Sequence, residues 1–324
     1  MAATVEPASQ RQGMAWIPGA TFAMGSEDFY PEERPVHRVT VDGFWMDEKP
    51  VTAAEFRRFV RETTYVTVAE RPLDPVEYPD ADPGMLVPGS LVFRGTSGPV
   101  SLDDYRNWWE YVPGAFWKRP GGKGTTINGR DTHPVTHVAY EDAEAYAAWA
   151  DKELPTEAEW ELAARGGLEG KVFAWGDEHF PDGKPMANTW QGEFPWQNLK
   201  LDGYERTSPV GSFPPNGYGL YDITGNVWEW TSDWYVPRHS DEVASPCCVP
   251  SNPRVTSPSQ SYDPGQPGEH IPRKVIKGGS HLCAPNYCLR YRPAARQPQM
   301  VDTSMSHLGF RCIVREPGTE KGAA

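Results

Sequence analysis

The sequence lacks any long apolar run. No segment approaches the roughly 20 consecutive apolar residues that a membrane-spanning helix needs, and the opening MAATVEPASQRQG has no basic start followed by an apolar stretch. A secretory signal peptide would show both of these features. We therefore expect a cytoplasmic protein with no membrane partner.

Cysteine is also scarce. The 324 residues include five cysteines, an odd number that leaves at least one thiol unpaired and does not suit a secreted disulfide framework. No two of them have the Cys-x-x-Cys spacing of thioredoxin-like proteins, and none form the double pair of a zinc finger. The sequence therefore supports neither a dithiol shuttle nor structural zinc.

Basic residues are too few for a protein that binds nucleic acid. The chain has 31 Lys and Arg against 44 Asp and Glu, which gives a net charge of -13. This charge repels phosphate backbones and anionic lipid surfaces. Solubility is the simplest role of the excess acid, although an acidic groove for a basic peptide is compatible with it.

Glycine, proline and aromatic residues, by contrast, are abundant. The 31 Gly and 33 Pro interrupt long helices and strands, while 13 Trp, 14 Tyr and 12 Phe can fill a core. These counts favour a loop-rich fold over a helical bundle or a doubly wound sheet. We expect one domain over residues 14–315, between small polar tails at 1–13 and 316–324.

Three segments have the pattern of short helices. A Thr followed three residues later by Glu forms a capping box, and this pattern predicts helices over 52–62 and from 156 to the Gly166-Gly167 stop. Apolar residues at helical spacing predict a third helix over 142–150.

Strands are expected where apolar residues alternate between Gly and Pro boundaries. This pattern occurs at 14–24, 37–44, 275–278 and 309–314. The segment 238–273 is rich in Ser, Pro, Asp and Gly and is too long for an ordinary loop, so it is a candidate functional or substrate-facing excursion.

The chemically informative residues are two cysteines near the C-terminus. Cys283 and Cys288 follow the pair Gly278-Gly279, and Arg290 and Arg292 lie close enough in sequence to favour thiolate. From the residues alone, an inert buried pair or a structural disulfide remains an alternative. Two thiolates without a neighbouring His or carboxylate ligand suit a soft ion such as Cu(I).

The motifs around this pair resemble those of a known family. The block Gly278-Gly-Ser-x-x-Cys283-x-x-x-Tyr-Cys288-x-Arg-Tyr-Arg292, followed by Leu308-Gly-Phe-Arg-Cys312, is similar to the C-terminal active-site block of formylglycine-generating enzymes. Upstream, Leu154-Pro-Thr-Glu-Ala-Glu-Trp160 and Gly225-Asn-x-Trp-Glu-Trp230 follow in the family's order. The wider superfamily shares these upstream motifs without the activity, so they indicate only the fold, and the cysteine pair indicates the function.

The resemblance implies a loop-rich α+β fold of the C-type-lectin-like superfamily and an oxidase activity. Such enzymes convert the cysteine of a Cys-x-Pro-x-Arg stretch in a sulfatase to Cα-formylglycine, with O2 as oxidant, Cu(I) as cofactor and a thiol reductant. Cys283 and Cys288 would hold Cu(I), while Ser280 and Trp228 would line the oxygen and substrate pocket. A turn role for Ser280 and a core role for Trp228 stay open.

The resemblance also implies two structural Ca2+ sites. In a fold with few regular elements, a bound ion can replace missing backbone contacts. Taken alone, the same residues could simply form turns. One site would comprise Asp222, Gly225, Val227 and Glu229, and the other Asn188, Thr189, Asp202 and Tyr204.

Departures from the family pattern carry further expectations. Secreted relatives have a disulfide that ends at the position of Cys312, but its partner is missing here, so we expect a buried free thiol in a bacterial-type enzyme. His307 stands where relatives have Asn near the substrate groove, which leaves peptide contacts there open. We assign no function to Cys247 and Cys248.

Two alternatives to a formylglycine-generating enzyme stay open. One is an inactive ligand-binding member of the same fold, and the other is a superfamily oxidase that acts on a small molecule.

Overall fold

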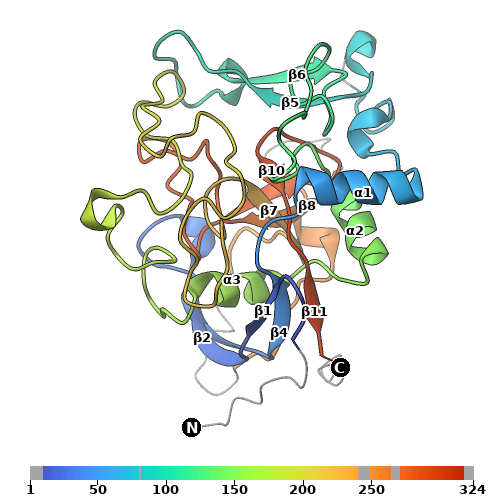
Figure 1. The fold of residues 1–324 in the computed structure, drawn as a ribbon. Helices are drawn as coiled ribbons and strands as arrows, with labels where there is room; N and C mark the ends of the chain where they lie inside the picture. The colour runs from blue at the N-terminus through green and yellow to red at the C-terminus, as the bar shows by residue number, and fades with distance from the viewer. Residues whose placement is uncertain (1–9, 80–81, 240–248, 264–270, 317–324) are drawn as a thin grey trace.

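Regular structure is sparse in the parts of the chain that the computed structural model describes, which are residues 10–79, 82–239, 249–263 and 271–316. In these residues the α-helices have at most 11 residues, and the strands have at most seven. Loops connect them over most of the molecule (Figure 1). The predicted loop-rich α+β architecture is confirmed.

The helices begin where the capping signals place them. Helix α1 (Ala53–Thr63) and helix α3 (Glu157–Arg165) each start with a complete Thr–Glu capping box, and α3 ends at Gly166 with a left-handed φ of 56°. Helix α2 (Tyr140–Trp149) begins two residues before the predicted start. The reason is that the Asp142 carboxylate accepts the Ala139 N–H at 2.8 Å, so Asp142 caps the first turn from within the helix.

The strands are shorter and more numerous than predicted. The expected strand over 14–24 is interrupted at Pro18-Gly19, and the one over 37–44 is interrupted at Asp42-Gly43. Strands β5, β6, β7 and β9 were not predicted. The full set is β1 (Met14–Ile17), β2 (Ala20–Met24), β3 (His37–Val41), β4 (Phe44–Asp47), β5 (Gly89–Phe93), β6 (Trp109–Pro113), β7 (Trp228–Trp234), β8 (Arg273–Lys277), β9 (Arg296–Met300), β10 (Leu308–Gly309) and β11 (Ile313–Arg315).

The central sheet has the strand order β10-β7-β8-β9, with β10 parallel to β7 and the other pairs antiparallel. The chain leaves this sheet after β8 and returns to it at β9, so the two cysteines lie in the connection between these strands. A second sheet, β1-β4-β11, joins the two ends of the described chain. The strands β2 and β3 form a two-stranded sheet, and so do β5 and β6. The β5-β6 sheet lies far from the termini (Figure 1).

Helix α3 lies between the central sheet and the N-terminal strands (Figure 1), and all nine of its residues are buried. Its charged residues therefore need partners. The Glu161 carboxylate accepts from Lys277 Nζ at 3.0 Å, from Arg165 Nη2 at 2.6 Å and from the Gly25 N–H at 2.8 Å. Burial alone would raise the pKa of Glu161, but the charges of Lys277 and Arg165 outweigh it and lower that pKa to about 2.

Cys312 is buried and forms no disulfide among the described residues, as expected. Cys247 and Cys248 lie outside the described residues. None of the helices that the structure describes is both long and apolar enough to cross a membrane.

The first testable prediction concerns Glu161. Replacing it with Ala leaves Lys277 and Arg165 buried without their partner, so we expect the free energy of unfolding to fall by about 3–5 kcal/mol. Urea denaturation measures this change. The matched control is Glu62→Ala, which removes an exposed i,i+4 pair with Arg58 and should change stability by less than about 0.5 kcal/mol.

The pH dependence of the stability that Glu161 contributes follows from its lowered pKa. Because the pKa of Glu161 is lowered, its contribution is fully present above the usual value of 4.5 and is lost as the pH falls toward 2. Equal stability losses for the two variants at neutral pH would contradict a stabilising role for this buried network.

Candidate active site

The two cysteine sulfurs face each other at the centre of the loop between β8 and β9. Cys283 Sγ and Cys288 Sγ are 3.1 Å apart, and both side chains are buried in one apolar cluster with Trp228 and Tyr291. A disulfide would bring the sulfurs to about 2.05 Å. In the structure the pair is therefore two free thiols. It is not the structural disulfide that remained an alternative from the sequence.

Two glycines allow the loop to fold back on itself. A Cβ on Gly279 would lie 2.8 Å from the backbone of Arg290 and Tyr291, and Gly279 has a φ of 67°. Gly278 has a φ of 90°, and its Cβ would lie 3.0 Å from the Trp160 ring. A side chain at Gly279 would clash with the backbone near the end of the loop, and one at Gly278 would clash with the Ile223 carbonyl and the Trp160 ring, so both positions require glycine.

A positive charge lies beside Cys288. Arg290 Nη1 is 3.9 Å from Cys288 Sγ, while Arg290 Nη2 donates to Glu32 Oε1 at 2.7 Å and the guanidinium covers the Tyr30 ring at 3.8 Å. Tyr30 Oη in turn accepts the Leu289 N–H at 3.0 Å. Glu32 and Tyr30 therefore fix the arginine that faces the sulfur.

The two thiols differ in acidity. The hydrogen bond from Cys283, helped by the charge of Arg290, outweighs burial and lowers the pKa of Cys288 to about 7. Burial, together with the neighbouring Cys288, raises the pKa of Cys283 well above its usual value. Cys288 is therefore the more acidic thiol of the pair, and it is the one that ionises first.

Ser280 and Trp228, which the resemblance assigned to the pocket, lie on two sides of the pair. The Ser280 N–H donates to Cys283 Sγ at 3.4 Å, and its buried hydroxyl pairs with His307 Nδ1 at 3.1 Å. Trp228, the first residue of β7, is 1% exposed and belongs to the same apolar cluster as both cysteines. Trp228 thus has the core contacts that the alternative role required, and Ser280 has a direct contact with a thiol.

An aromatic surface adjoins the cysteines, and it was not assigned from the sequence. Tyr287 stacks on Phe194 with ring centroids 4.6 Å apart and packs edge-on against Trp108. The backbone N–H of Trp190 donates to the Cys283 carbonyl at 3.0 Å. Tyr287 remains 37% exposed, so the cysteine loop reaches solvent along an aromatic edge.

The donor set of the pair fits a soft ion. Among the described residues, no group of three or more His, Cys, Asp or Glu side chains is arranged to hold a metal, so the two sulfurs stand without a third such ligand. Four-coordinate zinc is disfavoured, whereas Cu(I) accepts two thiolates. Cys283 and Cys288 would be the residues that hold such an ion.

In the first predicted calcium group, Glu229 forms a buried ion pair with Arg311. Both carboxylate oxygens of Glu229 accept from Arg311, at 2.8–3.0 Å, and one also accepts from Trp160 Nε1 at 2.8 Å. Arg311 also donates to the Asp222 carbonyl at 3.1 Å. Arg311 and Trp160 therefore both donate to this carboxylate, and the role of Glu229 as a calcium ligand stays a prediction.

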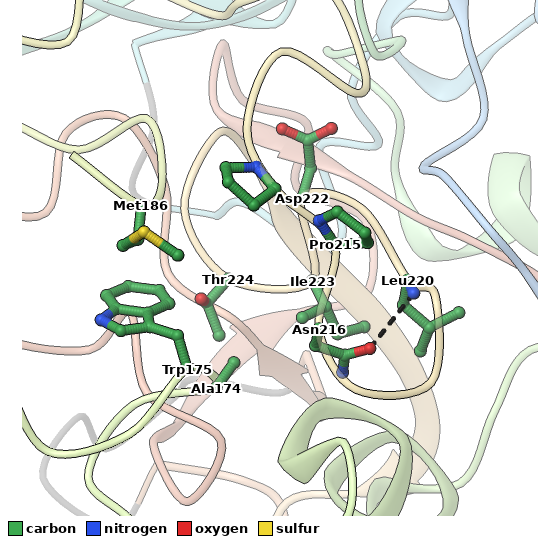
Figure 2. Close-up of a pocket in the computed structure, with 10 residues that line it drawn as sticks. Ala174, Trp175, Met186, Pro215, Asn216, Leu220, Asp222, Ile223 and Thr224 are labelled. Atoms are coloured by element: carbon green, nitrogen blue, oxygen red, sulfur yellow. Dashed lines mark hydrogen bonds between the residues drawn. The ribbon is translucent and has the colours of Figure 1, made fainter. Parts of the chain in front are cut away.

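Asp222, from the same group, is held by hydrogen bonds. Its carboxylate accepts the Gly211 N–H at 2.6 Å and the Asn226 side chain at 3.4 Å. Burial raises the pKa of Asp222. The carboxylate points away from Trp175 and Met186, which line the same small pocket (Figure 2). Gly225 and Val227 follow in the turn that leads into β7.

The second predicted calcium group is brought together. The Asp202 carboxylate accepts the N–H groups of Thr189 and Tyr204, at 3.2 and 2.9 Å. The Gln191 side-chain amide donates to Asp202 Oδ2 at 2.9 Å and also to the Thr189 carbonyl and hydroxyl oxygens. Asn188 is buried beside them and donates to the Arg206 carbonyl. Oxygens converging on one point are a donor set that suits Ca2+.

Comparisons with known proteins agree with this geometry. The family model described as "Sulfatase-modifying factor enzyme 1-like domain" matches residues 2–316. The formylglycine-generating enzyme of Mycobacterium tuberculosis is 53% identical over 298 residues, which cover 92% of this chain and 96% of the relative. The mouse protein named inactive C-alpha-formylglycine-generating enzyme 2 is 42% identical over 314 residues, with 94% and 86% covered.

A solved structure gives the same fold. PvdO from Pseudomonas aeruginosa superposes with a TM-score of 0.63 at 24% identity and covers 94% of each chain. At this identity the likeness concerns the fold alone. The match to the family model, which spans nearly the whole chain, and the relative at 53% identity establish the family. The chain therefore belongs to the sulfatase-modifying factor enzyme 1-like family.

Proposed function

We propose that this protein oxidises the cysteine of a Cys-x-Pro-x-Arg stretch in a sulfatase to Cα-formylglycine, with O2 as oxidant, a thiol as reductant and Cu(I) held by Cys283 and Cys288. The observation that carries the proposal is the pair of buried free thiols 3.1 Å apart at the edge of an exposed aromatic surface. Relatives named formylglycine-generating enzyme, at up to 53% identity, support the substrate and the reaction.

Family membership alone does not separate catalysis from binding, since a relative named inactive is 42% identical to this chain. The cysteine pair favours catalysis. A purely structural pair would not require a fixed arginine beside one sulfur, yet Arg290 is held there by both Glu32 and Tyr30.

The reaction balances as follows. The substrate thiol, O2 and two reductant thiols give the aldehyde, hydrogen sulfide, water and one disulfide. Bound Cu(I) would supply the one-electron chemistry with O2 that protein side chains lack. The chain's own part is to hold Cys288 as a thiolate through Arg290 and to exclude water through the aromatic cluster around Trp190 and Phe194.

The surface beside the loop suits a basic peptide. Tyr287 and Trp196 are exposed aromatic residues, and the Glu193 carboxylate accepts from Asn286 within the aromatic edge. The net charge of -13 favours the approach of a substrate that carries arginine. We therefore place the substrate peptide along this edge, with its thiol toward the cysteine pair.

Copper binding should depend on both thiols. A Ser hydroxyl is a hard and mostly protonated donor, so Cys283→Ser and Cys288→Ser should each weaken Cu(I) affinity by at least tenfold, or about 1.4 kcal/mol. Competition against a Cu(I) chelator measures this. The control Cys312→Ser removes another buried thiol outside the pair and should leave the affinity unchanged. Wild-type affinity in either active-site variant would disprove the two-sulfur site.

The thiolate of Cys288 should titrate near neutrality. In the metal-free protein, the ultraviolet thiolate absorbance that is lost in Cys288→Ser should have its midpoint at about pH 7. Arg290→Gln removes the adjacent positive charge and should raise that midpoint. The control Arg58→Gln, at an exposed pair on α1, should not shift it. A midpoint that does not respond to Arg290→Gln would contradict the assigned cause.

The calcium proposal can be tested at the group around Asp202. If Ca2+ binds there for stability, chelation should lower the melting temperature of the wild type by a few degrees, because a ligand that binds the native state stabilises it. Asp202→Ala should start at the lower temperature and show no response to the chelator. The control Asp177→Ala, at an exposed ion pair, should respond like the wild type. A wild type without any response would remove calcium from this account.

A further inference from the structure

His307 lies just before β10, and its ring contacts the active-site loop. Its Nδ1 atom is 3.1 Å from Ser280 Oγ, and its backbone carbonyl accepts the backbone N–H of Trp228 at 2.8 Å. Its ring packs edge-on against Trp109, with ring centroids 4.7 Å apart. The sequence left this position as an open question about the substrate groove. The structure instead aims the imidazole at Ser280, with only 9% of the residue exposed.

The hydrogen bonds of Ser280 indicate whether the His307 imidazole donates to its hydroxyl group or accepts from it. Ser280 Oγ accepts the Leu282 N–H at 3.2 Å, and a hydroxyl has one proton to donate. His307 Nδ1 is the acceptor within reach of that proton. Burial, reinforced by the nearby rings of His281 and His137, lowers the pKa of His307, so the ring is neutral and keeps an unprotonated nitrogen.

Ser280 also links this hydroxyl to the reactive pair. Its backbone N–H donates to Cys283 Sγ at 3.4 Å, so a shift of the Ser280 backbone alters a contact with the thiol. No hydrogen bond joins His307 to either sulfur in the described part of the chain, so the hydrogen-bonded route from His307 to the pair passes through Ser280.

We propose that His307 is a positioning residue of the cysteine-pair site: its imidazole accepts the hydrogen bond of the Ser280 hydroxyl and holds Ser280 in the orientation that contacts Cys283. This inference rests on the proposed function and goes beyond it, because it assigns a role in turnover to a residue outside the cysteine loop. Since His307 has no hydrogen bond or ring contact with either thiol or with Tyr287 among the described residues, its loss should lower kcat rather than raise KM.

Two substitutions of His307 separate the effect of its hydrogen bond from the effect of its ring. Asn offers a side-chain oxygen that can accept from Ser280, whereas Leu fills space without accepting. We expect His307→Leu to lower kcat about tenfold, the size that one neutral hydrogen bond supports. KM and Cu(I) affinity should stay within about threefold, and His307→Asn should recover most of kcat.

The matched control is His133, another histidine whose ring pairs with a hydroxyl group. Its Nδ1 lies 3.0 Å from Thr207 Oγ1, and neither residue has a hydrogen bond to the cysteine loop among the described residues. His133→Leu should therefore leave kcat near the wild-type value, and melting curves should show whether each variant is folded.

A double-mutant cycle between His307→Leu and Ser280→Ala tests the proposal directly. If His307 acts through Ser280, the double variant should be no slower than Ser280→Ala alone. As a readout independent of turnover, the ring-nitrogen NMR shifts of His307 should change in Ser280→Ala, and those of His133 should not.

The outcomes are distinguishable. An active wild type in which the two substitutions multiply, or in which His307→Leu keeps full kcat, overturns the positioning role and leaves the proposed function intact. Failure of the Asn variant to recover kcat, in a folded protein, also overturns it, because the ring and not the hydrogen bond would then matter. A wild type that makes no aldehyde overturns the proposed function and this inference together.

Discussion

Buried ion pairs on both sides of the cysteine loop hold the centre of this structure together. Each joins a basic residue in or next to the loop to a glutamate far away in the sequence, on α3 or on the short turn at 31–33. Removing either partner of such a pair leaves an uncompensated buried charge, which costs several kcal/mol. The buried pairs are Lys277–Glu161, Arg296–Glu157 and Arg292–Glu33, and the partly exposed pair Arg290–Glu32 joins the loop to the same turn.

This arrangement explains how an irregular loop can carry a precise site. The connection between β8 and β9 has no regular backbone ladder, and its two glycines would otherwise give it conformational freedom. The ion pairs fix the loop at both ends. Arg290 serves twice, because the same guanidinium that binds Glu32 also faces Cys288. Stability of the fold and acidity of the reactive thiol therefore depend on one set of contacts.

Local signals in the sequence were sufficient for the helices and for the cysteine pair. The capping boxes at the starts of α1 and α3 need only neighbouring residues, and the Gly278-Gly279 pair with its two cysteines is also local. Strands β5 and β7 were missed because Gly, Ser and Trp obscure their alternation. The domain limits at 14–315 stay a prediction.

Long-range partners could not be predicted from a single sequence. Glu32 meets Arg290 across 258 positions, and Glu229 meets Arg311 across 82. The second pairing gives Glu229, which the resemblance names as a calcium ligand, an arginine partner that its local sequence did not indicate. His307 likewise meets Ser280 only because β10 joins β7 in the central sheet.

The central claim is that the cysteine pair oxidises a peptide cysteine to an aldehyde, and product mass tests it most directly. The wild-type protein would be incubated with a Cys-Thr-Pro-Ser-Arg peptide, O2, copper and a thiol reductant. The account predicts a product in which sulfur has been replaced by an aldehyde oxygen and which reacts with a hydrazine or aminooxy probe. A peptide recovered as its thiol or only as a disulfide, from copper-loaded and folded protein, would contradict it.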